Sequence, residues 1–127
     1  MADEECGPRG PPDAMSCIFC RIAAGEIPAS RVLEDEHLVA FHDLNPKAPV
    51  HVLVVPREHV ESVGTATEAR AELLGRMLLA CRRVAEQCGV AGGGFRVVLN
   101  TGPDAGQTVP HLHAHVLGGR VLSWPPG

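Results

Sequence analysis

Five short segments of the chain show the alternating or continuous apolar pattern that is typical of β-strands. They are Arg31–Glu34, Leu38–Asp43, His51–Pro56, Phe95–Asn100 and Pro110–Leu117. A short loop rich in glycine, aspartate and proline joins the last two, so an antiparallel hairpin is the simplest way to pair them. The pattern therefore predicts a single antiparallel sheet.

Two segments carry the three- and four-residue spacing of an amphipathic helix. The longer one runs from about Glu68 to Cys88, and a run of glycines follows it. A shorter one, Cys17 to about Ala24, has Ser16 as its capping residue and ends at Gly25. We expect an α+β domain with one long and one short helix, in which the helix or helices cover one face of the antiparallel sheet.

Composition limits the domain organisation and the partners. Residues 1–14 are acidic and rich in glycine and proline, which predicts a disordered tail before one domain over residues 15–127. The net charge of −4 argues against a nucleic-acid polymer as partner. No apolar run is long enough to cross a membrane. Five cysteines, an odd number, suit a reducing compartment, so we expect a cytoplasmic location with the nucleus as a second compartment.

The last strand-like segment holds three alternating histidines, His111, His113 and His115. In an extended chain they would line one face, because successive side chains point to opposite faces. One zinc ion could use two of them together with His51 or Asp104, as in a catalytic metal site. A neutral imidazole is also a nucleophile that can attack phosphorus, and the middle histidine has an imidazole on each side to stabilise charge. This second interpretation makes His113 the nucleophile.

The loop before the histidines supports chemistry on a phosphoryl group. It reads Gly-Pro-Asp-Ala-Gly-Gln-Thr over residues 102–108. Such a loop resembles an anion nest, in which successive backbone N–H groups point into one concavity. Thr108 adds a hydroxyl donor next to the histidines.

The sequence HLHAHVL has the form His-apolar-His-apolar-His-apolar-apolar and resembles the signature of the histidine-triad family. The resemblance extends over residues 18–127, through the segments IFCRIAAGEIPAS, VAFHDLNPKAPVHVLVVPREHV, FRVVLN and GQTVPHLHAHVLGGR and the terminal SWPPG. These segments are most similar to the Hint branch of that family. The tail before them shows no such similarity.

The resemblance implies an adenosine phosphoramidase-type hydrolase. Members of this branch bind purine nucleoside monophosphates and hydrolyse P–N bonds through a nucleotidyl-histidine intermediate, with no cofactor required for catalysis. They form homodimers that share a continuous sheet. By position the resemblance implies a catalytic set of His113, His115, His51 and His111. It implies nucleotide contacts from His113, His115, Asp43, Leu44, Asn100, Gly106, Gln107, Thr108, Ile18, Phe19, Ile22, Ile27, Phe41 and Trp124.

Two cysteines distinguish this chain from the Hint members that have a similar C-terminal sequence. Cys17 and Cys20 are similar to a pair in zinc-carrying histidine-triad proteins, which implies a structural zinc site with His59 and His111. The alternative is that the two thiols are packed as small apolar groups. A second functional class, a nucleotide-binding scaffold with little turnover, would be expected to have a broken histidine triplet, and this triplet is intact.

Overall fold

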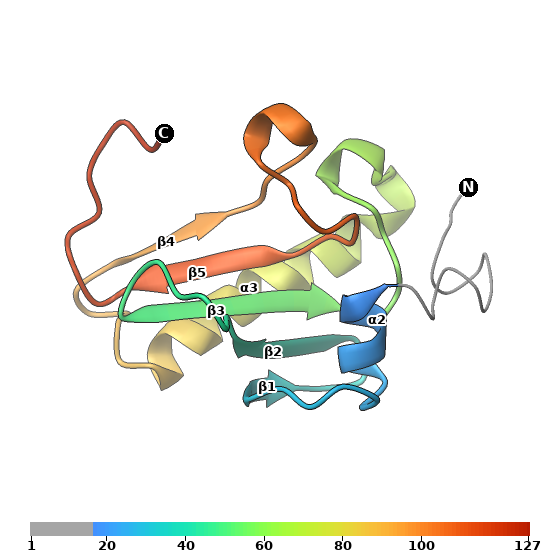
Figure 1. Cartoon of the computed structure of the whole chain (residues 1–127), viewed down its shortest axis with the longest axis horizontal. Coiled ribbons are helices and arrows are strands. Elements are labelled where there is room, and N and C mark those ends of the chain that lie inside the picture. The colour runs from blue at the N-terminus through green and yellow to red at the C-terminus, as the bar shows by residue number, and fades with distance from the viewer. Residues whose placement is uncertain (1–16) are drawn as a thin grey trace.

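The computed structural model describes residues 17–127, so the predicted tail over residues 1–14 lies outside the described residues. These residues form a five-stranded sheet of order β1-β2-β3-β5-β4 in which every neighbouring pair is antiparallel (Figure 1). The strands are β1 (Arg31–Glu34), β2 (Leu38–His42), β3 (Val50–Pro56), β4 (Phe95–Val98) and β5 (Ala114–Gly118). The predicted α+β class with one antiparallel sheet is confirmed.

The histidine segment departs from its prediction, because β5 begins only at Ala114. The N–H of Leu112 donates to the carbonyl oxygen of Val60 at 2.6 Å, and that of His111 to Val109 at 2.8 Å. The backbone at 111 and 112 therefore bonds to loops instead of a neighbouring strand. The expectation that three histidines line one face of one strand is wrong, and only His115 lies within β5.

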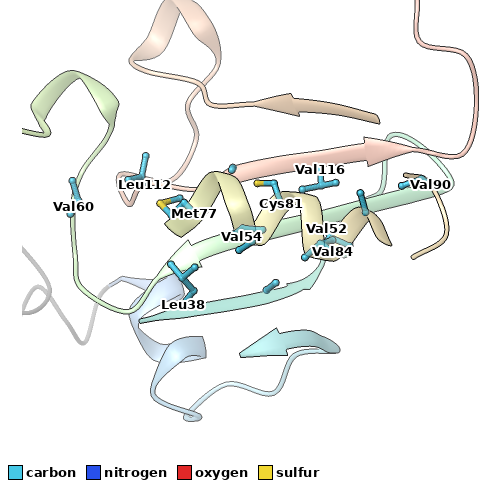
Figure 2. Close-up of a cluster of buried hydrophobic side chains, with 14 residues drawn as sticks. Leu38, Val52, Val54, Val60, Met77, Cys81, Val84, Val90, Leu112 and Val116 are labelled. Carbon is cyan, nitrogen blue, oxygen red and sulfur yellow. The ribbon is translucent and has the colours of Figure 1, made fainter. Parts of the chain in front are cut away.

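The long helix starts later than predicted. Residues Glu68–Arg70 form a 3-10 turn, η2, and the α-helix proper, α3, is Ala71–Gln87. Two further 3-10 turns are η1 (Val63–Thr65) and η3 (Pro103–Ala105). Helix α3 packs on β3 and β5, and the buried cluster between them is drawn in Figure 2. Its members include Met77, Cys81 and Val84 from the helix, and Val52, Val54 and Val116 from the sheet.

The core predicts a sharp contrast between two adjacent helix positions. Met77 is 1% exposed and Leu78 is 54% exposed. Met77→Ala should lower the free energy of unfolding by about 2–5 kcal/mol, because it leaves a cavity in the core. Leu78→Ala should change it by less than about 0.5 kcal/mol. Urea titration of the two variants measures both values, and equal losses would contradict this packing.

The short helix, α2 (Ile18–Ala23), lies on the other face of the sheet. Phe19, Ile22 and Ala23 pack there against the residues of β2 and β3 that alternate with the first cluster: Val39, Phe41, Leu53 and Val55. Helix α3 covers one face, as expected, whereas α2 lies on the other face, so the two helices do not share a face. The strand alternation explains this result, since buried side chains project from both faces of β2 and β3. Within residues 17–127 no helix is long and apolar enough to span a membrane.

Candidate active site

The functional side chains gather on the face that α2 covers only in part. In the register of β3 and β5, Leu53 lies opposite His115, so the two side chains share this face. His51 precedes Leu53 by two residues and projects from the same face. Asp43 follows β2, and its N–H donates to the His51 carbonyl oxygen at 2.9 Å. One end of the sheet thus brings a carboxylate and two imidazoles together.

The hydrogen bonds of His51 determine which of its nitrogens carries a proton. The backbone N–H of Lys47 donates to His51 Nδ1 at 3.0 Å, so Nδ1 is the acceptor and the proton lies on Nε2. His51 Nε2 is 2.8 Å from His115 Nδ1 and 3.4 Å from Asp43 Oδ2. The Nε2–H therefore donates to His115 Nδ1. This leaves His115 with its own proton on Nε2, where it can act as a donor to a ligand.

His113 has the opposite tautomer. Its Nδ1–H donates to the backbone oxygen of His111 at 2.7 Å, which leaves an unprotonated lone pair on Nε2. Phe19 packs edge-on against the ring with centroids 5.1 Å apart, and the centroids of His113 and His115 are 5.0 Å apart. The ring is thus fixed in orientation by one hydrogen bond and by its neighbours. An imidazole held in this way is suited to nucleophilic attack through Nε2.

Burial keeps these rings neutral. It lowers the pKa of His113 and of His51 below the ordinary imidazole value of 6.5. For His115, burial and then the neighbouring His113 and His51 lower the pKa to about 4. A ring that is neutral at pH 7 keeps the lone pair that a nucleophile needs.

The pKa of His115 predicts a pH dependence of stability. In the unfolded chain His115 binds a proton below about pH 6.5, whereas in the folded chain it binds one only below about pH 4. The free energy of unfolding therefore falls as the pH falls between these values. Lowering the pH from about 7 to about 5 should reduce the free energy of unfolding through this group by about 1 to 2 kcal/mol. His115→Gln should make the loss smaller by that amount in urea titrations, whereas His42→Gln, at an exposed position, should not. Equal losses in all three proteins would contradict the assignment.

His111 does not join the other two histidines of the triplet. It is fully buried, its Nε2–H donates to the Pro56 carbonyl oxygen at 2.9 Å, and its Nδ1 lies 3.2 Å from Cys17 Sγ and 3.2 Å from His59 Nδ1. Its backbone carbonyl accepts the hydrogen bond from His113 Nδ1–H and so orients that ring. The membership of His111 in the catalytic set stays a prediction.

The same ring belongs to a cluster of four metal-ligating side chains. Cys17, Cys20, His59 and His111 each place one donor atom so that all four lie within 4.8 Å of one another. Cys20 Sγ is 3.5 Å from His111 Nδ1 and 3.7 Å from His59 Nδ1. Hydrogen bonding with Cys20, followed by that with His111 and His59, lowers the pKa of Cys17 far below its ordinary value, which favours the thiolate.

These four residues fit a zinc ion. Tetrahedral zinc with bonds of about 2.1 Å to nitrogen and 2.3 Å to sulfur separates its ligand atoms by roughly 3.3–3.8 Å. The separations of 3.2, 3.5 and 3.7 Å are close to that range. The bond from His111 Nε2–H to Pro56 also leaves Nδ1 unprotonated, as a ligand must be. A closed set of two thiolates and two imidazoles is typical of structural zinc.

The predicted nucleotide-contact residues divide by exposure. Leu44, Trp124 and Ile18 are exposed by 99%, 79% and 47%. Phe19, Ile22 and Phe41 are buried in the second cluster, and Ile27 packs against it. The buried side chains offer little surface, because they pack between α2 and the sheet. A base placed on this face would meet their edges together with Ile18.

The loop before the histidines is built around two glycines in the left-handed region, with φ of 81° at Gly102 and 85° at Gly106. The Gln107 side chain is occupied within this region: its Oε1 accepts from the Gly102 N–H, and its Nε2 donates to the Glu61 and Val109 oxygens. The backbone is occupied as well: the N–H of Gln107 donates to the Gly102 oxygen at 3.1 Å, and the N–H of Gly106 donates to the Pro103 oxygen at 3.0 Å. Thr108 is exposed and Asn100 is half-buried.

Three contributors were missed by the sequence reasoning. The backbone N–H of Lys47 fixes the tautomer of His51. Arg96 donates to the carbonyl oxygens of Leu122 and Ser123, and Arg120 donates to that of Lys47. A backbone donor leaves no residue-type signal in a sequence. Arg96 sits in an ordinary strand pattern, so nothing in the sequence singles it out.

Comparison with known proteins identifies the family. The model of the HIT domain matches residues 24–122, and the chain belongs to the HIT domain family. Adenylylsulfatase HINT1 of Arabidopsis thaliana is 40% identical over 99% of this chain and 86% of its own length. The 14 kDa zinc-binding protein of Zea mays is 44% identical over 91% of each chain.

A solved structure agrees with this assignment. The crystal structure of a HIT family hydrolase from Legionella pneumophila matches with a TM-score of 0.86 and 42% identity, covering 88% of this chain and 100% of that one. The fold, the histidine site and these relatives together define a hydrolase of the HIT type.

Proposed function

We propose that this chain is a purine nucleoside phosphoramidase, which cleaves the P–N bond between AMP or GMP and an amine. The observation that carries the proposal is the state of His113: a neutral ring whose Nδ1–H is held by the His111 carbonyl, with Nε2 unprotonated. Nucleophilic attack on phosphorus needs this tautomer. The resemblance of the chain to the Hint branch supports the choice of a purine nucleotide as substrate.

The first step forms a covalent intermediate. His113 Nε2 attacks the phosphorus atom, the P–N bond to the amine breaks, and a nucleotidyl-His113 bond forms. The departing amine gains a proton that enters from solvent and is relayed through the His51–His115 pair, so each ring ends the step neutral. Asp43 Oδ2, 3.4 Å from His51 Nε2, balances positive charge on that pair.

The second step reverses the roles of the same groups. Water attacks the phosphorus atom of the nucleotidyl-histidine, the bond to His113 Nε2 breaks, and AMP or GMP leaves. The proton lost by water passes through the His51–His115 pair to solvent, so the protein ends as it began. Thr108 and Asn100 are the proposed donors for the phosphoryl oxygens. Asp43 is the acceptor for the ribose hydroxyls.

Zinc would be held by Cys17, Cys20, His59 and His111, and this part of the proposal is supported by the distances above and by the name of the maize relative. When bound, zinc would tie α2 to the segment that precedes β5. His113 is not among the four ligands. A thiolate site of this kind suits a reducing compartment, which supports a cytoplasmic location, with the nucleus as a second one.

A homodimer with a continuous sheet is the proposed assembly. Strand β4 forms one edge of the sheet, and two exposed apolar residues lie near it, Leu79 on α3 and Phe95 at the start of β4. An edge strand with apolar surface close to it is suited to pairing with a second copy. Analytical ultracentrifugation should give twice the mass of one chain at micromolar concentration. The mass of a single chain would contradict this assembly.

A zinc-dependent hydrolase is the second candidate, because Asp43, His51 and His115 also bring one donor atom each within 4.8 Å. The two candidates differ in their response to metal removal. An assay of AMP release from adenosine 5′-phosphoramidate, before and after dialysis against a strong chelator, separates them. The histidine mechanism predicts turnover that survives dialysis at temperatures where the protein stays folded. Absence of turnover in both samples would favour a nucleotide-binding scaffold and contradict the proposed function.

A further inference from the structure

The two thiols of the proposed zinc site stand one turn apart at the start of α2. Cys17 is the N-cap residue, with an extended backbone (φ −86°, ψ 113°), and its Sγ accepts from the N–H of Cys20 at 3.4 Å. The two sulfur atoms lie within 4.8 Å of each other. Helix geometry separates Cα atoms three residues apart by roughly 5 Å, and a disulfide requires about 4.4–6.8 Å. The pair can therefore form a bond without unwinding α2.

The thiols form the solvent side of this site, and the imidazoles form its inner side. Cys17 and Cys20 are half-buried, whereas His111 is fully buried and His59 is only 9% exposed. A small oxidant that arrives from solvent therefore meets sulfur first. A cysteine that ligates zinc is deprotonated, and the thiolate is the form of cysteine that reacts with oxidants.

The two other cysteines within residues 17–127 lack these features. Cys81 is 1% exposed on α3, and burial raises its pKa to about 11. Cys88 follows the same helix, and burial raises its pKa as well. Thiols that stay protonated at neutral pH react slowly. Seven helical residues also separate the two by roughly 10 Å, which is too far for a disulfide.

We infer that Cys17 and Cys20 form an oxidation-sensitive pair: hydrogen peroxide converts them to a disulfide, and the site then releases its zinc. The Cys17 thiolate attacks one peroxide oxygen, the O–O bond breaks, and hydroxide leaves, which gives a sulfenic acid. The Cys20 thiolate attacks this sulfur and expels a second hydroxide as the S–S bond forms. The sulfurs lose two electrons in total and the peroxide gains them, and the two hydroxides take up protons from solvent to become water.

The disulfide removes both thiolate ligands, because a disulfide sulfur carries no negative charge. The two remaining imidazoles are too few to hold zinc in a closed tetrahedral site. The inference thus rests on the zinc ligand set of the proposed function, and it does not depend on the phosphoramidase reaction.

The other end of α2 is attached by contacts that oxidation does not touch. Arg57 Nη1 donates to the Ala23 carbonyl oxygen at 2.7 Å. Arg31 Nη2 donates to the Ile22 carbonyl oxygen at 2.7 Å. Phe19 and Ile22 also pack against the sheet in the second cluster. The oxidised chain should therefore stay folded, and a dithiol should reverse the change by thiol–disulfide exchange.

The test treats reduced, zinc-loaded protein with hydrogen peroxide and measures released zinc with a chromogenic chelator, followed by peptide mass spectrometry. One zinc ion per chain should be released, and the peptide that carries Cys17 and Cys20 should lose two hydrogen atoms in mass. Dithiothreitol together with added zinc should restore the starting state.

Two single variants are the controls. Cys88→Ser and Cys6→Ser should release zinc to the same extent as the wild type, because neither position supplies a sulfur to the pair. Zinc that stays bound after peroxide treatment would overturn the inference. So would a disulfide from Cys17 or Cys20 to another cysteine, or sulfinic and sulfonic acids in place of the disulfide.

The outcomes separate this inference from the proposed function. If the reduced protein holds no zinc, the ligand set fails, and the mass of the peptide alone decides whether the two thiols pair. Turnover of adenosine 5′-phosphoramidate by the reduced protein tests the hydrolase reaction independently of either result.

Discussion

Replacing His113 by alanine should lower kcat for adenosine 5′-phosphoramidate by about 10⁴-fold or more, because the attacking atom is removed. The substitution leaves the proposed phosphate donor Thr108 and the proposed ribose acceptor Asp43 in place. Binding of AMP should therefore weaken by no more than about tenfold, as isothermal titration calorimetry would show. The variant should separate binding from chemistry.

Two controls make this result specific. His42→Ala changes an exposed histidine at the end of β2 and should keep wild-type turnover. His115→Ala removes the group that faces His51 and should lower kcat by about 10²–10⁴-fold, the usual loss for a proton-transfer group. A His113→Ala protein that hydrolyses the phosphoramidate at the wild-type rate would contradict the nucleophile assignment.

The second large effect is expected at the cysteine pair. The double variant Cys17→Ser, Cys20→Ser should bind no zinc, whereas the wild type should hold one ion per chain by elemental analysis. Loss of a structural zinc should lower the free energy of unfolding by at least about 3 kcal/mol, because the ion binds only the folded chain. For a domain of this size the corresponding fall in Tm is about 10 °C.

Cys88→Ser is the matched control. Cys88 is half-buried at the end of α3 and packs against the apolar cluster between α3 and the sheet, away from the proposed zinc ligands. It should keep both the zinc content and most of the Tm. Turnover of the double variant, measured below its lowered Tm, should fall by no more than about tenfold, the scale of a change next to the reacting group. Equal zinc content in the double variant and the wild type would contradict the proposed ligand set.

Much of the fold could be predicted from the sequence because its strands are strongly patterned. The bounds of β1 matched, and the other elements differed by a few residues at their ends. The placement of α2 could not be predicted, since β2 and β3 are apolar on both faces and the sequence does not say which face a short helix covers. The start of β5 was wrong because alternation was extended to residues whose backbone bonds to Val60 and Val109.

The candidate site shows the same division. Cys17, Cys20, His59 and His111 were grouped by resemblance, and the structure does bring them together. The tautomers of His51 and His113 could not be predicted, because they depend on the Lys47 N–H and the His111 carbonyl, which are backbone groups. The hydrogen bonds of the Gln107 side chain could not be predicted either, because their acceptors include the backbone oxygens of Glu61 and Val109.

Trapping the covalent intermediate tests the central claim most directly. The protein would be mixed with adenosine 5′-phosphoramidate, quenched within milliseconds and examined by intact-mass and peptide mass spectrometry under conditions that preserve P–N bonds. We predict one adenylyl group per chain, carried by His113 and absent from the His113→Ala variant. Turnover without any such adduct, or an adenylyl group located on another residue, would contradict the mechanism.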